Sequence, residues 1–177
     1  MNISIVLTIV SDDHPGVVEQ LSDILEQHDG NWTQSSMLSL AGKFAGILLA
    51  SVPQARVDDF LESMTALQSR GMHIVAQRAG APASDVGFRE FHLQLLGQDR
   101  PGIVHDIAGI LSRHHINVQE LETQCQSASM SGEVLFMARA RILVPPETSL
   151  EATRQELESL ANELMVDLKL EVPSKTA

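Results

Sequence analysis

The sequence has little of what would mark a secreted, membrane-spanning or disulfide-linked protein. Its 177 residues include a single cysteine, Cys125, which excludes an internal disulfide. No apolar run approaches the roughly 20 residues that a membrane-spanning helix needs. The first four residues lack the basic and apolar regions of a signal peptide. We therefore expect a cytoplasmic protein that does not enter a membrane.

Basic and aromatic residues are also scarce. The chain has 12 lysines and arginines against 23 acidic residues, and aromatic residues make up only 3% of it. Residues 1–84 contain 9 acidic and 4 basic residues, and residues 85–177 contain 14 and 8, so both halves are negatively charged. Nucleic-acid binding requires basic side chains that neutralise phosphates. We therefore expect no direct nucleic-acid partner.

No group of residues indicates a catalytic or metal site. Among seven histidines, His114 and His115 are adjacent, and no two have the i, i+4 spacing of a helical metal site. Cys125 has no neighbouring cation that would activate its thiol. No nucleophile–base pair, phosphate-binding loop or metal set recurs in the sequence. We expect no bound metal, no cofactor and no enzymatic activity.

The sequence does contain an internal repeat. Asp-His-Pro-Gly-Val-Val at 13–18 returns as Asp-Arg-Pro-Gly-Ile-Val at 99–104, an offset of 86 residues, and the flanking apolar residues match at the same offset. A repeated loop with repeated flanks indicates two like modules. We predict module one at 1–79, a small-residue linker rich in glycine and proline at 80–87, and module two at 88–173.

Both modules have the same predicted order of elements, strand-helix-strand-strand-helix-strand. In module one, hydrophobic periodicity and turn residues predict strands at 3–9, 31–40, 44–52 and 72–77, and helices at 15–28 and from 53 to 70. In module two they predict strands at 91–96, 116–124, 134–144 and 166–172, and helices at 101–114 and 150–165. This order is typical of an α+β fold with two ferredoxin-like βαββαβ modules, each with two helices on one face of an antiparallel sheet.

The repeated loop joins the first strand of each module to its first helix. Proline suits the start of a helix, a preceding aspartate can cap free N–H groups, and glycine lets a ligand approach the main chain. Together with the helix dipole, these features favour a small anion site. Asn31 and Asn117 begin the next strand, and we expect them beside the loop, where they would help to bind an amino acid. A capped turn that binds nothing is the alternative.

The loop motif at 99–104, followed by Asn117-Val118 at the start of the next strand, resembles the amino-acid-binding ACT domain, and the resemblance extends over both modules. In that family the loop and the start of the second strand line ligand sites at interfaces between modules or subunits. The sequence departs from the usual pattern at His14, where arginine is common, and at Trp32, where a small aliphatic residue is usual. Whether module one binds the same ligand is therefore left open. The resemblance implies these ligand-binding residues: Asp13, His14, Pro15, Gly16, Val17, Asn31, Asp99, Arg100, Pro101, Gly102, Ile103 and Asn117.

Two such modules without an attached enzyme resemble the group of glycine cleavage system transcriptional repressors, as does the stretch Ser36–Phe44. This resemblance implies a regulatory protein that binds a small amino acid, glycine or a similar one. It further implies repression of glycine cleavage genes through a DNA-binding transcriptional activator as protein partner, and it leaves a homodimer open. An amino-acid-sensing protein that regulates a metabolic enzyme in trans is the alternative.

Overall fold

The computed structural model describes residues 1–80, 86–127 and 134–173. The chain divides into two compact units, Met1–Ala83 and Ser84–Ala177, and each unit has its own hydrophobic core. Most of the linker predicted at 80–87 lies outside the described residues.

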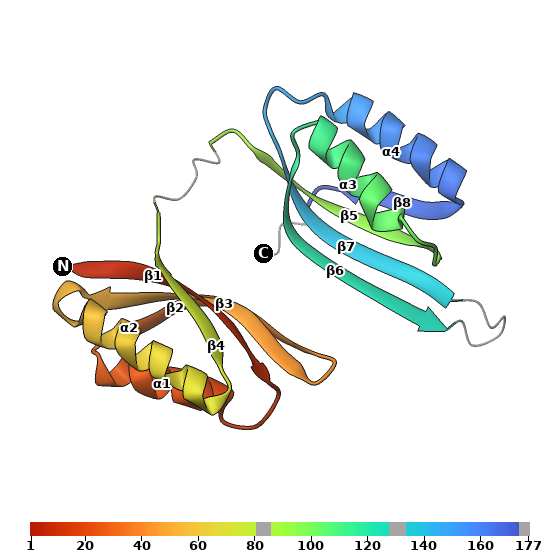
Figure 1. Ribbon diagram of the computed structural model, residues 1–177. Helices are drawn as coiled ribbons and strands as arrows, with labels where there is room; N and C mark the ends of the chain where they lie inside the picture. The colour runs from red at the N-terminus through yellow and green to blue at the C-terminus, as the bar shows by residue number, and fades with distance from the viewer. Residues whose placement is uncertain (81–85, 128–133, 174–177) are drawn as a thin grey trace. The chain divides into compact units, whose positions relative to one another are not determined.

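The first unit is a four-stranded antiparallel sheet with two helices on one face (Figure 1). The strand order in the sheet is β2-β3-β1-β4. Two short 3-10 helices, η1 (Gln54–Arg56) and η2 (Leu67–Arg70), flank the second helix. The main elements are β1 (Asn2–Asp12), α1 (Val17–Gln27), β2 (Asn31–Leu40), β3 (Lys43–Pro53), α2 (Val57–Ala66) and β4 (His73–Arg78).

The second unit repeats this arrangement, with the strand order β6-β7-β5-β8. Its elements are β5 (Arg89–Gln98), α3 (Ile103–Arg113), β6 (Asn117–Ser127), β7 (Val134–Val144), α4 (Leu150–Leu164) and β8 (Val166–Glu171). The prediction of two ferredoxin-like βαββαβ modules is therefore confirmed.

Alternating burial explains how each sheet forms its core. In β1, Ile5, Leu7 and Ile9 are fully buried beneath the helices, and the residues between them point to the opposite face. The apolar face of α1 packs down on them through Val17, Leu21 and Leu25 at helical spacing. The same pattern builds the core of the second unit, where α3 and α4 cover β5 and β7.

Several predicted boundaries are wrong by a few residues. The first helix of each unit begins two residues later than predicted, because Gly16 and Gly102 have φ values of 96° and 95°, outside the range of an α-helix. Pro53 ends β3 and is followed by η1 rather than opening an α-helix directly. Strand β6 continues to Ser127, beyond its predicted end at 124.

Candidate functional site

The loop between the first strand and first helix has the same backbone geometry in both units. Gly16 and Gly102 occupy the N-cap positions in a left-handed conformation. Their carbonyl oxygens accept the first helical hydrogen bonds, from the N–H of Gln20 at 3.0 Å and of Asp106 at 2.9 Å. Because the N-cap residue is a glycine, no side chain at that position satisfies the first-turn N–H groups. These groups are therefore oriented to donate to an anion.

The prediction that the loop aspartates cap the helices is wrong. The carboxylate of Asp13 accepts a hydrogen bond from the Ser39 hydroxyl at the end of β2. Cys125 has the equivalent position in the second unit, and after desolvation the negative charge of Asp99 is the next cause that raises the pKa of its thiol. The backbone N–H groups of the two aspartates donate to Gly42 at 3.0 Å and to Val134 at 2.8 Å. Both aspartates thus tie the loop to the neighbouring hairpin.

The surroundings of Cys125 make its thiol harder to ionise. Reduced hydration of the thiol raises the pKa of Cys125, and the nearby negative charge and hydrogen bond of Asp99 raise it further. A raised thiol pKa lowers the fraction of reactive thiolate at neutral pH.

An acidic side chain lies beside each loop glycine. A Cβ atom placed on Gly16 would lie 3.7 Å from Oε2 of Glu19, and one placed on Gly102 would lie 3.9 Å from Oδ2 of Asp106. Sequence reasoning missed both residues, although acidic residues in the first turn of a helix were the available signal. Each loop therefore presents N–H donors for a carboxylate next to a carboxylate that attracts an ammonium group. This pairing suits the two charged groups of an amino acid.

Asn31 and Asn117 do not lie beside the loop of their own unit, which corrects the prediction. Asn31 pairs with Ser51 of β3, and Ser51 pairs with Ser4 near the start of β1, whereas the loop follows the other end of β1. At about 3.3 Å per residue, the eight residue steps from Ser4 to Asp12 span roughly 26 Å. Asn117 has the equivalent register in the second unit. Within one unit, the loop and the asparagine therefore cannot hold the same small ligand.

The cations near the two loops differ. His14 and Arg100 are both exposed, and Nδ1 of His14 lies 3.0 Å from the Pro15 carbonyl oxygen. The first unit adds an ion pair that sequence reasoning missed, between Lys43 and Asp12, and its hydrogen bond and charge lower the pKa of Asp12. The register of β1 and β3 would have predicted this pair, because it makes Asp12 and Lys43 cross-strand partners.

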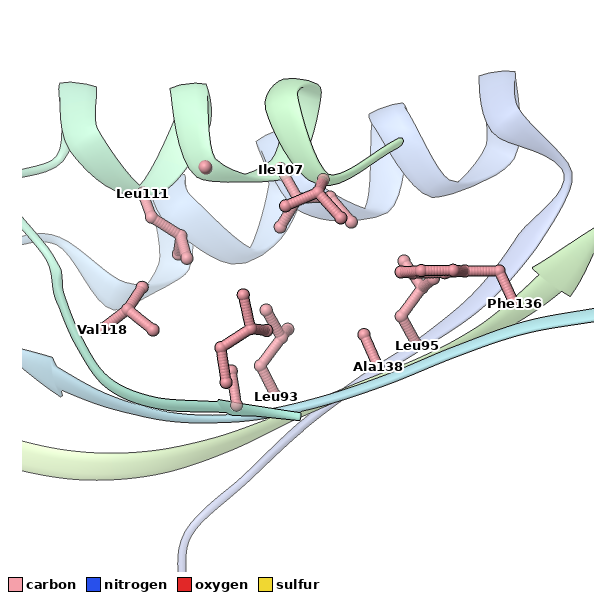
Figure 2. Close-up of a pocket in the computed structure, with 11 residues that line it drawn as sticks. Leu93, Leu95, Ile107, Leu111, Val118, Phe136 and Ala138 are labelled. Atoms are coloured by element: carbon pink, nitrogen blue, oxygen red, sulfur yellow. The ribbon is translucent and has the colours of Figure 1, made fainter. Parts of the chain in front are cut away.

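The second unit contains an apolar cavity of about 50 Å³ between α3 and its sheet (Figure 2). Ile107 and Leu111 of α3 face Leu93, Phe136 and Ala138 of the sheet across this space. All the lining residues are apolar, so the cavity has no group that binds the charged ends of an amino acid. It therefore differs in chemistry from the loop site, although Val104 in the first turn of α3 lines it.

The histidines that end the first helix of each unit join it to the second helix. Nε2 of His28 lies 3.0 Å from the Ser63 hydroxyl, and Nε2 of His114 lies 2.6 Å from the Glu156 carboxylate. Arg113 also pairs with Glu156 at 2.8 Å, and Arg113 and His114 together lower the pKa of this carboxyl. Across residues 1–80, 86–127 and 134–173, no three His, Cys, Asp or Glu side chains are grouped as a metal site requires. No helix in these ranges is long and apolar enough to span a membrane.

Comparison with known families gives this duplicated fold its identity. ACT-domain family models match residues 4–77 and residues 92–162, one match in each unit. The chain is a tandem ACT-domain protein. ACT domains are regulatory modules that typically bind amino acids. No curated protein matches the chain significantly.

Two solved structures resemble the protein over nearly its full length. A structure described as an unknown protein from Galdieria sulphuraria is 28% identical, with a TM-score of 0.87, covering 98% of this chain and 100% of the other. A protein provisionally named a glycine cleavage system transcriptional repressor is 16% identical, with a TM-score of 0.69 and 99% coverage of both chains. At 16% identity, the similarity to this second structure shows a common fold.

Proposed function

We propose that this tandem ACT-domain protein is an amino-acid-responsive regulator that represses glycine cleavage genes through a DNA-binding transcriptional activator. The observation that carries the proposal is the loop at Gly16 and Gly102, which has the same geometry in both domains and places first-turn N–H groups that the N-cap glycine does not cap next to an acidic side chain. The full-length fold shared with a protein provisionally named as such a repressor is consistent with this role.

The ligand in this proposal is a small amino acid such as glycine. Its carboxylate accepts hydrogen bonds from the first-turn N–H groups of α1 or α3, where the helix dipole is positive. Its ammonium group is attracted by Glu19 in the first domain or Asp106 in the second. Asn31 and Asn117 contribute only where the loop of another ACT domain is brought to them, because the loop of their own domain lies at the far end of the sheet.

Calorimetric titration with glycine, serine and alanine tests the binding step. We expect saturable binding of at least one of them, and Glu19→Gln and Asp106→Asn form a matched pair that identifies the domain responsible. Loss of the attracting charge should weaken binding about 10- to 100-fold in that domain, since a hydrogen bond to a charged group contributes about 1.5–3 kcal/mol. Absence of binding to all three amino acids would contradict the proposal.

Transcript measurement tests the regulatory step separately. Deletion of the gene should raise glycine cleavage transcripts in the source organism, and the Asp106→Asn variant should change their response to glycine. The purified protein alone should not shift glycine cleavage promoter DNA in a gel at low salt, because both halves of the chain are negatively charged. If transcripts do not change while amino-acid binding is retained, the protein regulates a different target, such as a metabolic enzyme in trans.

A further inference from the structure

The two ACT domains differ on the sheet face that points away from the helices, here called the open face. In each domain, three rows of cross-strand neighbours form the centre of this face, with one residue from each of the four strands in every row. The rows are equivalent in the two domains because the registers are equivalent. They can therefore be compared position by position.

The open face of the first domain carries no Asp, Glu, Lys or Arg in these rows. Its twelve residues are Gln34, Leu49, Val6 and Gln77 in one row, Ser36, Ile47, Thr8 and Val75 in the next, and Leu38, Ala45, Val10 and His73 in the third. Several of the large apolar side chains are well exposed: Leu38 by 57%, Ile47 by 55%, Val75 by 57% and Val10 by 42%. Leu40, next to these rows on β2, is 71% exposed.

The equivalent rows of the second domain are charged at seven of twelve positions. They read Glu120, Arg141, His92 and Glu171, then Glu122, Arg139, Gln94 and Lys169, then Gln124, Met137, Leu96 and Asp167. Arg141 pairs with Glu120 at 2.7 Å and with Glu90 at 3.4 Å, and this pairing lowers the pKa of Glu120. The charged open face of the second domain is thus suited to exposure to water. The open face of the first domain lacks such charges.

We propose that the open face of the first ACT domain packs against the same face of a second copy of the chain. Four strands about 4.8 Å apart and about nine residues long give a face of roughly 20 Å by 30 Å. Two such faces bury roughly 1,200 Å² in total, which is the lower limit for a specific interface. Seven of the twelve residues in the central rows of this face are apolar, and large contiguous apolar patches are rarely left exposed on a monomer.

Charge explains why the first domain of the second copy, rather than its second domain, covers this face. Covering this face with the open face of a second domain would bury Arg139, Arg141 and their acidic neighbours against apolar side chains, and burying charges in this way is costly. Two copies of the uncharged face desolvate no charge in these rows. Lys43 and Asp12 stand at the rim, exposed by 63% and 75%, where a polar border is typical of an interface. The net charge of −11 on each copy opposes association, so a contact between copies is most favourable at a face that carries no charge of its own.

Sedimentation equilibrium of the full chain, without any amino acid, tests this proposal independently of ligand binding. We expect a dimer at micromolar concentration. Ile47→Arg places in the first domain the residue that the second domain has at the equivalent position, Arg139. Burying that unpaired charge on both copies should raise the Kd for dimerisation at least about 100-fold.

Gln27→Arg is the matched control, because it adds the same charge on an exposed position of α1, away from the open face. This variant should remain as dimeric as the wild type. Circular dichroism and the fluorescence of Trp32 show whether both variants are folded. A wild-type chain that is monomeric at 100 µM, or an Ile47→Arg variant that dimerises as tightly as Gln27→Arg, would overturn the proposal. In the first case a different protein or another part of the same chain covers the face.

Discussion

Filling the apolar cavity of the second ACT domain should stabilise that domain. Ala140 lines this cavity and pairs with Leu93 of β5. In the first domain the equivalent position is Leu48, which pairs with Leu7 and is fully buried. The fold therefore accommodates a leucine at this position, and we predict that Ala140→Leu raises the free energy of unfolding of the second domain.

The size of the effect follows from the cavity. A cavity costs about 24 cal/mol per Å³, so the loss of about 50 Å³ of empty space is worth roughly 1.2 kcal/mol. Leucine adds three carbon atoms to alanine, and their burial contributes up to about 2.4 kcal/mol. Small movements of the lining side chains offset part of this gain, since overpacking costs about 1–3 kcal/mol. The expected net stabilisation is about 1 kcal/mol.

Urea unfolding measures this effect, and the single tryptophan separates the two domains. Trp32 packs against the core of the first domain, and the chain has no other tryptophan and no tyrosine. Ala140→Leu should move the circular dichroism transition of the second domain upward by about 1 M urea and leave the Trp32 fluorescence transition unchanged.

The reverse substitution, Leu48→Ala, is the matched control. It should lower the Trp32 fluorescence transition, because Leu→Ala in a core costs about 3–5 kcal/mol. A second domain that is destabilised by Ala140→Leu would refute the reasoning, since the space between α3 and the sheet would then be too small or too rigid to hold the side chain.

Three further predictions concern the loops and the helix contacts. Gly102→Ala should destabilise the second domain by about 1–2 kcal/mol in urea unfolding, because φ is 95° while the added Cβ meets no atom closer than 3.9 Å; an unchanged midpoint would show that the loop relaxes freely. Asp99→Asn should lower the pKa of Cys125 and speed its alkylation by iodoacetamide at pH 8, and an unchanged rate would disprove the contact. The pKa of Glu156 is lowered, chiefly by Arg113, so its stabilising effect is present above the ordinary value of 4.5 and is lost as the pH falls through the folded-state pKa. Glu156→Gln should therefore reduce the fall of the second domain's unfolding midpoint as the pH is lowered. If the midpoint falls as steeply as in the wild type, other carboxyl groups cause the pH dependence.

The sequence alone determined the number of domains, the order of their elements and most of their cores. These features depend on local patterns: the repeated Asp-x-Pro-Gly loop, the alternation of Ile5, Leu7 and Ile9, and the helical spacing of apolar residues in α1. The position of the loop before each first helix was also predicted from sequence, because glycine and proline at a helix start have direct backbone consequences. Local patterns do not determine which strands become neighbours, so the surroundings of the loop could not be derived in the same way.

Only the tertiary structure determined which residues are neighbours in space. The order β2-β3-β1-β4 places β3 between β1 and β2, and β3 is antiparallel to both. The start of β2 therefore lies at the same end of the sheet as the start of β1. Asn31 is for this reason at the far end of the sheet from the loop, although the sequence motif contains both. Register brings Ser39 to Asp13, and it turns residues scattered over four strands into one uncharged face in the first domain and one charged face in the second. Such pairings join residues far apart in the chain, and their energy depends on the complete sheet, which no short segment encodes.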